Sequence, residues 1–358
     1  MLTREQIAAL SQEQKANHYE QQLLKDVKNN HTILVKETLE DVINTNASSF
    51  SINVFNSDQE TALYIACTNG NLDIVKLLIH FNGINVNLGK RTNGWGIYLF
   101  KCCVELTSPL YVAALSGHLQ IVQALVVEGR ANYNINIPTS ALHAAITNNK
   151  TDVAEYLLSL PSINIESTEL AINNSKNYEP LLYTAVAKGN LRLVNALLAT
   201  GRIDVNEFAK YSTKHDSYNH IESSHFSQNN ALICAIGNMP IFQKLLEQAN
   251  IVFNNSYEIQ KVGLDYKETI ISPLGHAIIN RKIEFANKLI DDPRYDKKFG
   301  KNEVIDISGD PGSRNDYEYS TLDLAINAGL NEIADKLRNA GVTEITKVNA
   351  AAPNCALI

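Results

Sequence analysis

The chain has 358 residues, of which 45% are apolar, and its formal net charge at pH 7 is −7. This length exceeds what one ordinary compact core can hold, so we expect either several domains or an elongated repeat architecture. Because the lysines and arginines are scattered along an acidic chain, and phosphate contacts need a dense basic stripe, the composition argues against nucleic acid as a partner.

Membrane-spanning and secreted classes are also disfavoured. No run approaches the roughly 20 apolar residues of a membrane helix, and the charged amino terminus lacks the apolar stretch of a secretory signal. The five cysteines, at positions 67, 102, 103, 234 and 355, are odd in number and match neither a disulfide framework nor paired zinc ligands. We therefore expect a soluble body in a reducing cytosol, without a metal or cofactor.

The first elements along the chain are an amino-terminal segment, residues 1–18, and a helix pair within residues 19–50. In this pair Leu24, Val35 and Leu39 hold the apolar positions that recur in the copies described next. The polar signature of those copies is missing. A terminal pair with one face toward water is expected to differ in this way, so we interpret residues 19–50 as a cap.

A segment of similar sequence recurs through residues 51–340. The first copy reads TALYIACTNGNLDIVKLLI, and its pattern predicts two short antiparallel helices. The seven copies have their cores near residues 61–79, 108–126, 140–158, 180–198, 230–246, 272–290 and 320–337. The last three are degenerate.

Local signals place the helix ends and the buried face of each copy. A side chain able to cap a helix amino terminus opens five copies: Thr61, Ser108, Ser140, Ser272 and Ser320. A glycine is placed where the first helix should end in a left-handed residue: Gly70, Gly117, Gly189 and Gly329. Paired aliphatic residues predict the buried stripe of the second helix: Ile74-Val75, Ile121-Val122 and Leu193-Val194.

These segments resemble ankyrin repeats, whose pattern is T-P-L-H-x-A-A-x-x-G-H-x-x-I-V-x-x-L-L. The resemblance implies an all-α solenoid of about seven helix-pair repeats. Spacing between copies exceeds the family's period of about 33 residues at nearly every step. We therefore expect extended hairpin insertions, or fingers, between the second helix of one copy and the first helix of the next, where recognition would be elaborated.

The first long insertion, residues 88–106, contains the only tryptophan of the chain. Its Asn93-Gly94 pair predicts a two-residue hairpin turn. Trp95, with Tyr98 and Phe100, is a candidate partner-binding anchor, because tryptophan is enriched at binding hot spots. Alternatively, these three rings fold back as a satellite core over the helices.

The insertion at residues 207–228 supplies Tyr211, His215 and Tyr218 as further candidate partner contacts. Its histidines at 215, 220 and 225 are a conceivable zinc set, but an interval of five fits one face of neither a helix nor a strand. An ordinary solvated loop is the favoured interpretation. The acidic segment 305–319 likewise lacks calcium-loop spacing and is interpreted as a turn-rich connection.

No nucleophile elbow, phosphate loop, metalloprotease helix or kinase motif occurs, so we expect a protein without catalytic activity. His143 fills the histidine position of the ankyrin pattern, which holds tyrosine in other copies, and is interpreted as structural. An active site assembled from scattered finger residues is the alternative.

Residues 341–358 are predicted to form a flexible tail that ends in AAPNCALI. Cys355 and the aliphatic residues after it match the box that prenyltransferases modify. Prenylation would hold the chain at the cytoplasmic face of membranes; without it the chain would be soluble. Repeats and tail together resemble ankyrin effectors that intracellular bacteria inject into eukaryotic hosts. This resemblance implies host proteins as partners of the fingers and first helices, with a host prenyltransferase as the modifying enzyme.

Overall fold

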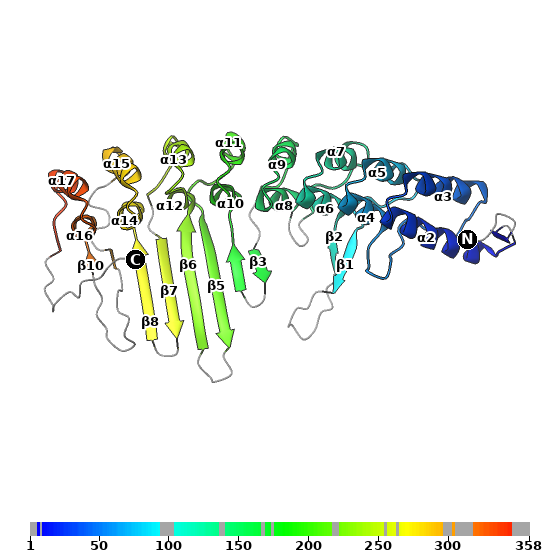
Figure 1. Ribbon diagram of the computed structural model, residues 1–358, viewed down its shortest axis with the longest axis horizontal. Helices are drawn as coiled ribbons and strands as arrows, with labels where there is room; N and C mark the ends of the chain where they lie inside the picture. Colours follow the sequence, from blue (N-terminus) through cyan, green and yellow to red (C-terminus); the bar gives the residue numbers. More distant parts are fainter. Residues whose placement is uncertain are drawn as a thin grey trace. The chain divides into compact units, whose positions relative to one another are not determined.

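The computed structural model describes residues 6–7, 9–93, 104–135, 140–165, 169–172, 175–216, 222–253, 256–262, 265–295, 303–304 and 318–345. They form two compact units, Met1–Ile165 and Glu166–Ile358 (Figure 1). Helix pairs build both units, and the second unit adds an extended antiparallel sheet.

The first unit consists of helix pairs and one short hairpin. Its elements are α2 (Gln12–Lys28), α3 (Thr32–Asn44), α4 (Ala62–Asn69), α5 (Leu72–Ile79), β1 (Lys90–Asn93), β2 (Val104–Thr107), α6 (Pro109–Ser116), α7 (Leu119–Val127), α8 (Ala141–Thr147) and α9 (Thr151–Leu158). First helices of successive pairs contact one another, as do second helices, so the apolar faces of neighbouring pairs form a continuous core.

The second unit alternates hairpins with helix pairs. Its elements are β3 (Glu169–Ile172), β4 (Ser175–Tyr178), α10 (Leu181–Ala187), α11 (Leu191–Ala199), β5 (Phe208–Asp216), β6 (Glu222–Asn230), α12 (Ala231–Cys234), α13 (Met239–Leu246), β7 (Ser256–Val262), β8 (Asp265–Ile271), α14 (Pro273–Ile279), α15 (Ile283–Asp291), β9 (Glu303–Val304), β10 (Glu318–Tyr319), α16 (Thr321–Asn327) and α17 (Asn331–Asn339). The described fold is therefore mostly helical, as expected, and the hairpins between helix pairs add strands, so that it is not purely α.

Helix ends follow the predicted local chemistry. The side chains of Thr61, Ser108, Ser140, Ser272 and Ser320 each accept a hydrogen bond from the backbone N–H three residues later, which confirms the five predicted caps. The four predicted glycines adopt positive φ angles, from 67° at Gly189 to 86° at Gly117. The predicted aliphatic stripe of the second helices is buried.

Asparagine side chains connect successive helix pairs. Asn53 donates to the carbonyl of Gly83 at 2.7 Å, and its side-chain oxygen accepts from the backbone N–H of Asn85 at 2.8 Å. Asn134 makes the same two contacts with Ser162 and Asn164. Each such asparagine satisfies backbone groups of the loop one pair further along, which explains part of the abundance of asparagine in the chain.

In the second unit, Asn206 repeats this arrangement. Its side chain donates to the carbonyl of Asn250 at 2.8 Å and accepts from the backbone N–H of Val252 at 2.7 Å. In this unit too, therefore, an asparagine side chain connects successive helix pairs.

Candidate interaction surface

Three successive hairpins of the second unit join edge to edge. The sheet order is β3-β4-β5-β6-β7-β8, and all neighbours are antiparallel. Register pairs Tyr178 of β4 with Lys210 of β5, and Gln228 of β6 with Tyr257 of β7. In Figure 1 the strands β5 to β8 extend away from the helix pairs, which lie at one end of the sheet.

The favoured interpretation of residues 207–228 as a solvated loop is wrong, because most of them form β5 and β6. Nine residue pairs join these two strands, and β4 and β7 flank them on either side. Backbone hydrogen bonds with both neighbouring hairpins stabilise a segment that, taken alone, shows only weak strand character.

At the root of the sheet, Tyr178, Glu207, Phe208 and Lys210 line a shallow depression. The hydroxyl of Tyr178 donates a hydrogen bond to the carboxylate of Glu207. The ammonium of Lys210 lies 5.9 Å from the centre of the Tyr178 ring, within range of a cation–π interaction. Lys210 is exposed, so the depression combines half-buried rings with a cation that solvent reaches.

Tyr211 lies next to Lys210 in β5 but contacts the helices. Its ring centre is 6.4 Å from that of Tyr183 in α10. Burial raises the pKa of both phenols, and the hydrogen bonds that Tyr211 donates to Tyr183 and Glu179 raise the pKa of Tyr211 further. Both hydroxyls therefore stay protonated near neutral pH, and the pair anchors the hairpin to its helix pair.

Ser256 and His276 make an equivalent connection between β7 and α14. The Ser256 hydroxyl oxygen lies 2.7 Å from His276 Nε2. Burial lowers the pKa of His276 to about 4, because the surroundings disfavour the charged imidazolium. The ring is therefore neutral at physiological pH and holds the root of the hairpin against its helix.

We expect this histidine to make the second unit less stable in acid. The pKa of His276 in the folded chain is below its ordinary value of 6.5, so the unfolded chain binds more protons between about pH 6.5 and 4. The free energy of unfolding should fall across that range, by up to about 3 kcal/mol. Urea unfolding at a series of pH values measures it. His276→Gln keeps a polar partner for Ser256 and should flatten the dependence; an unchanged slope would contradict the assignment.

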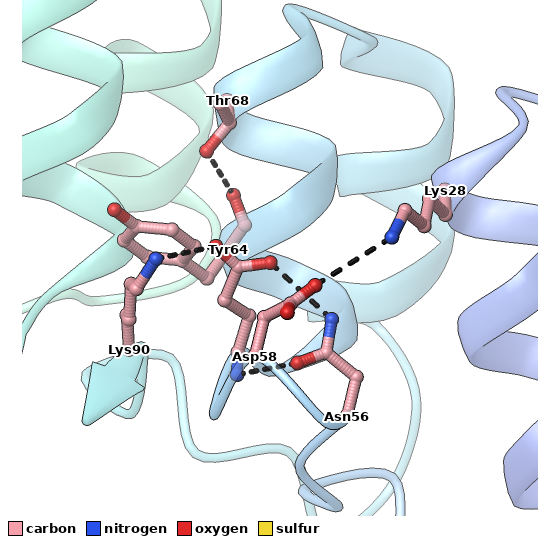
Figure 2. A network of polar contacts seen from close by, with 7 residues as sticks. Lys28, Asn56, Asp58, Tyr64, Thr68 and Lys90 are labelled. Atoms are coloured by element: carbon pink, nitrogen blue, oxygen red, sulfur yellow. Dashed lines mark hydrogen bonds and ion pairs between the residues drawn. The ribbon is translucent and has the colours of Figure 1, made fainter. Parts of the chain in front are cut away.

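In the first unit, polar contacts fix the root of the β1–β2 hairpin (Figure 2). The Lys90 ammonium lies 2.9 Å from the Glu60 carboxylate, which also accepts a hydrogen bond from the side chain of Asn56 at 3.2 Å. The hydrogen bond to Glu60 raises the pKa of Lys90. Lys28 of α2 approaches Asp58 at 3.5 Å. These charges are neutralised within the unit, which favours a structural role.

The family comparison assigns the helix pairs of the amino-terminal half. Residues 13–90 and 98–169 match the family model described as ankyrin repeats. These two segments are ankyrin repeats. The matched residues include the predicted cap pair and the first three predicted copies, and in the second unit the helix pairs keep the same order of cap, short helix, turn and second helix.

The comparison with solved structures finds the crystal structure of the human ASB11 ankyrin repeat domain. It is 19% identical to this chain, with a TM-score of 0.42, and the match covers 63% of this chain and 80% of that one. A search of curated proteins gives no match.

Several predicted site residues lie outside the described part of the chain: Trp95, Tyr98, Phe100, Tyr218, His220 and Cys355. Among the others, Tyr211 contacts Tyr183, and His215 occupies a position in β5 opposite Ser223. The predicted turn at Asn93-Gly94 is wrong, because Asn93 pairs with Val104 and is still part of β1. Across the described ranges, no group of three or more residues is placed to bind a metal.

Tyr178, Glu207 and Lys210 are site residues that the sequence analysis missed. The alternation of FAKYSTKHD in residues 208–216 is a weak signal for a strand, but the partner strand β4 lies more than a helix pair away in sequence.

In the part of the chain that is described, no helix is long and apolar enough to cross a bilayer.

Proposed function

We propose that this ankyrin-repeat chain is a non-catalytic scaffold that binds protein partners on the sheet formed by its hairpins. The observation that carries the proposal is the union of three hairpins into one six-stranded surface anchored to rigid helix pairs. Anchors such as Tyr211–Tyr183 and Ser256–His276 hold that surface in place before a partner arrives, which lowers the entropic cost of binding.

An enzyme is the alternative, and Ser256–His276 is the pair that most resembles a nucleophile with its base. A histidine whose pKa is about 4 removes a serine proton poorly at neutral pH. The contact also lies at a hairpin root, where it connects β7 to α14. These observations favour the scaffold.

The scaffold is tested by shortening the β5–β6 hairpin. A short turn in place of residues 213–225 keeps the Tyr211 anchor and removes the outer part of the sheet. Partner capture from eukaryotic cell lysate, quantified by mass spectrometry, should lose specific proteins with the shortened chain. Capture of the same proteins in the same amounts would contradict the proposal, provided that circular dichroism shows both chains to be folded.

We also propose that the chain is an effector that acts in a eukaryotic host, where prenylation of Cys355 holds it at host membranes. The support is the sequence of the last four residues together with the resemblance of the repeats to such effectors. The proposal requires Ile358 to be the last residue of the mature chain. No cluster of basic residues precedes the cysteine, so one isoprenoid would give reversible attachment.

Replacing Cys355 by serine is expected to move the chain from the membrane fraction to the cytosol of a eukaryotic cell. Serine cannot form the thioether, whereas the folded repeats should be unaffected. Intact-mass measurement of the chain that keeps Cys355 should show the added isoprenoid. The added mass distinguishes farnesyl from geranylgeranyl. Equal membrane binding by Cys355→Ser, or the absence of the added mass, would exclude prenylation while leaving the scaffold proposal intact.

A further inference from the structure

The two faces of the six-stranded sheet differ in composition. Alternate residues of a strand share a face, and residues paired across strands share it too, so the register assigns every strand position to one of two faces. One face holds four of the five strand lysines: Lys176, Lys210, Lys214 and Lys261. It also holds five of the six tyrosines and phenylalanines in these strands: Tyr178, Phe208, Phe226, Tyr257 and Tyr266. We name it the lysine–aromatic face.

Contacts at the root show how the two faces are oriented. On the lysine–aromatic face, Tyr178 and Lys210 are paired directly and their side chains meet, and Lys210 is exposed. On the opposite face, Ala209 is fully buried and Tyr211 contacts Tyr183 of α10. At its root, therefore, the opposite face is covered by the helices, whereas the lysine–aromatic face is the one that solvent reaches.

Charge on the lysine–aromatic face is arranged with a basic centre and an acidic border. The lysines belong to β4, β5 and β7, inside the sheet. The acidic residues of the same face lie at its margins: Glu169 and Glu268 on the edge strands, and Asp216 paired with Glu222 at the far end of the β5–β6 hairpin. Such a surface attracts a short acidic group at its centre and repels one that extends past its border.

We propose that the lysine–aromatic face binds a short acidic segment of a protein partner that also carries aromatic or apolar side chains. This inference rests on the proposed scaffold function and names the chemistry of its partner. Charge complementarity selects the acidic residues. The half-buried rings of Tyr178 and Phe208 offer apolar contacts beside Lys210, and rings of this kind are enriched at protein interfaces.

Observations favour a polypeptide over a nucleic acid as the occupant. The face carries four lysines and no arginine, and the chain as a whole has a net charge of −7. Phosphate backbones need denser positive charge than this, because affinity grows with the number of phosphates that are neutralised. A segment with a few carboxylates matches the number of lysines better.

The test measures binding of a fluorescein-labelled peptide of alternating glutamate and tyrosine, about twelve residues long, by fluorescence polarisation. The variant Lys210→Glu/Lys214→Glu/Lys261→Glu should bind at least about tenfold more weakly than the parent chain, since three attractive charges become repulsive toward the acidic peptide. Lys267→Glu is the matched control, because Lys267 of β8 belongs to the opposite face of the same sheet. It should change the affinity less than about twofold. Added salt should weaken binding to the parent chain.

Circular dichroism checks that each variant is folded; if the glutamate variant is not, the triple lysine-to-glutamine variant replaces it, with a smaller expected loss. Equal losses in the triple variant and in Lys267→Glu would overturn the proposal, as would the absence of peptide binding to the parent chain. If oligouridine binds more tightly than the peptide, the occupant of this face is a nucleic acid and the proposal of a protein segment is wrong. If shortening the hairpin removes partners from the lysate capture, but the triple lysine variant binds the peptide as tightly as the parent chain, the scaffold proposal stands. The lysine–aromatic face is then not its binding surface.

Discussion

Replacing Gly89 by alanine is expected to destabilise the first unit by about 3 kcal/mol, at the upper end of the usual cost of an overpacked site. A Cβ atom at this position would lie 1.9 Å from the carbonyl oxygen of Thr107 and 2.9 Å from the ring of Tyr64. The Thr107 oxygen belongs to the backbone of β2, so no side-chain rotation relieves the contact. The β1–β2 hairpin would have to separate at its root, where the carbonyl of Gly89 accepts a hydrogen bond from Thr61.

Gly83→Ala is the matched control for this prediction. Gly83 has a φ of 84° and no heavy atom within 4 Å of an added Cβ, so alanine there costs only the left-handed conformation, about 1–2 kcal/mol. Urea unfolding followed by circular dichroism compares the two variants. A Gly89→Ala chain as stable as the Gly83→Ala chain would show that the hairpin root is not packed as described.

Phe242→Ala is the substitution for which we expect the largest loss of stability in the second unit. Phe242 of α13 is fully buried, and its ring meets that of Phe285 in α15 edge to face at a centroid distance of 5.0 Å. Truncation removes the apolar contacts and leaves a cavity, which together cost about 3–5 kcal/mol. Because each helix pair is stabilised mainly by its neighbours, the loss should weaken the pairs on both sides.

Phe242→Leu separates the cavity from the loss of the ring contact. Leucine fills much of the volume, so this variant should retain most of the stability that alanine loses. Thermal and urea unfolding of the parent chain and both variants provide the measurement. Equal effects of leucine and alanine, or a loss below about 1 kcal/mol for alanine, would contradict the packing of α13 against α15.

The helix pairs could be predicted because their signals are local. A cap at Ser108, a left-handed glycine at Gly117 and the stripe at Ile121-Val122 all lie within one copy, and each acts through residues three or four positions away. The asparagine contacts are an intermediate case. Their motif is visible in the sequence, but the groups that Asn134 bonds lie about thirty residues further along the chain.

The hairpin sheet could not be predicted in the same way, because its strands depend on neighbours from other repeats. Residues 208–216 look like a polar loop when taken alone, because a helix pair separates them in sequence from β4, the strand of the preceding hairpin beside which they lie. The three histidines are the most conspicuous feature of residues 207–228 in the sequence. The register instead separates Tyr211 and His215 from Lys210 and Tyr178, so that the strand contributes to two chemically different faces.

The most direct test of a partner-binding sheet is photocrosslinking from its two faces in living eukaryotic cells. A photoreactive amino acid replaces Lys210 on the lysine–aromatic face, and in a second chain it replaces Lys267 on the opposite face. We predict discrete covalent adducts with one or a few proteins from position 210 and far fewer from position 267. Adducts of equal yield from both positions, or from neither, would contradict the account.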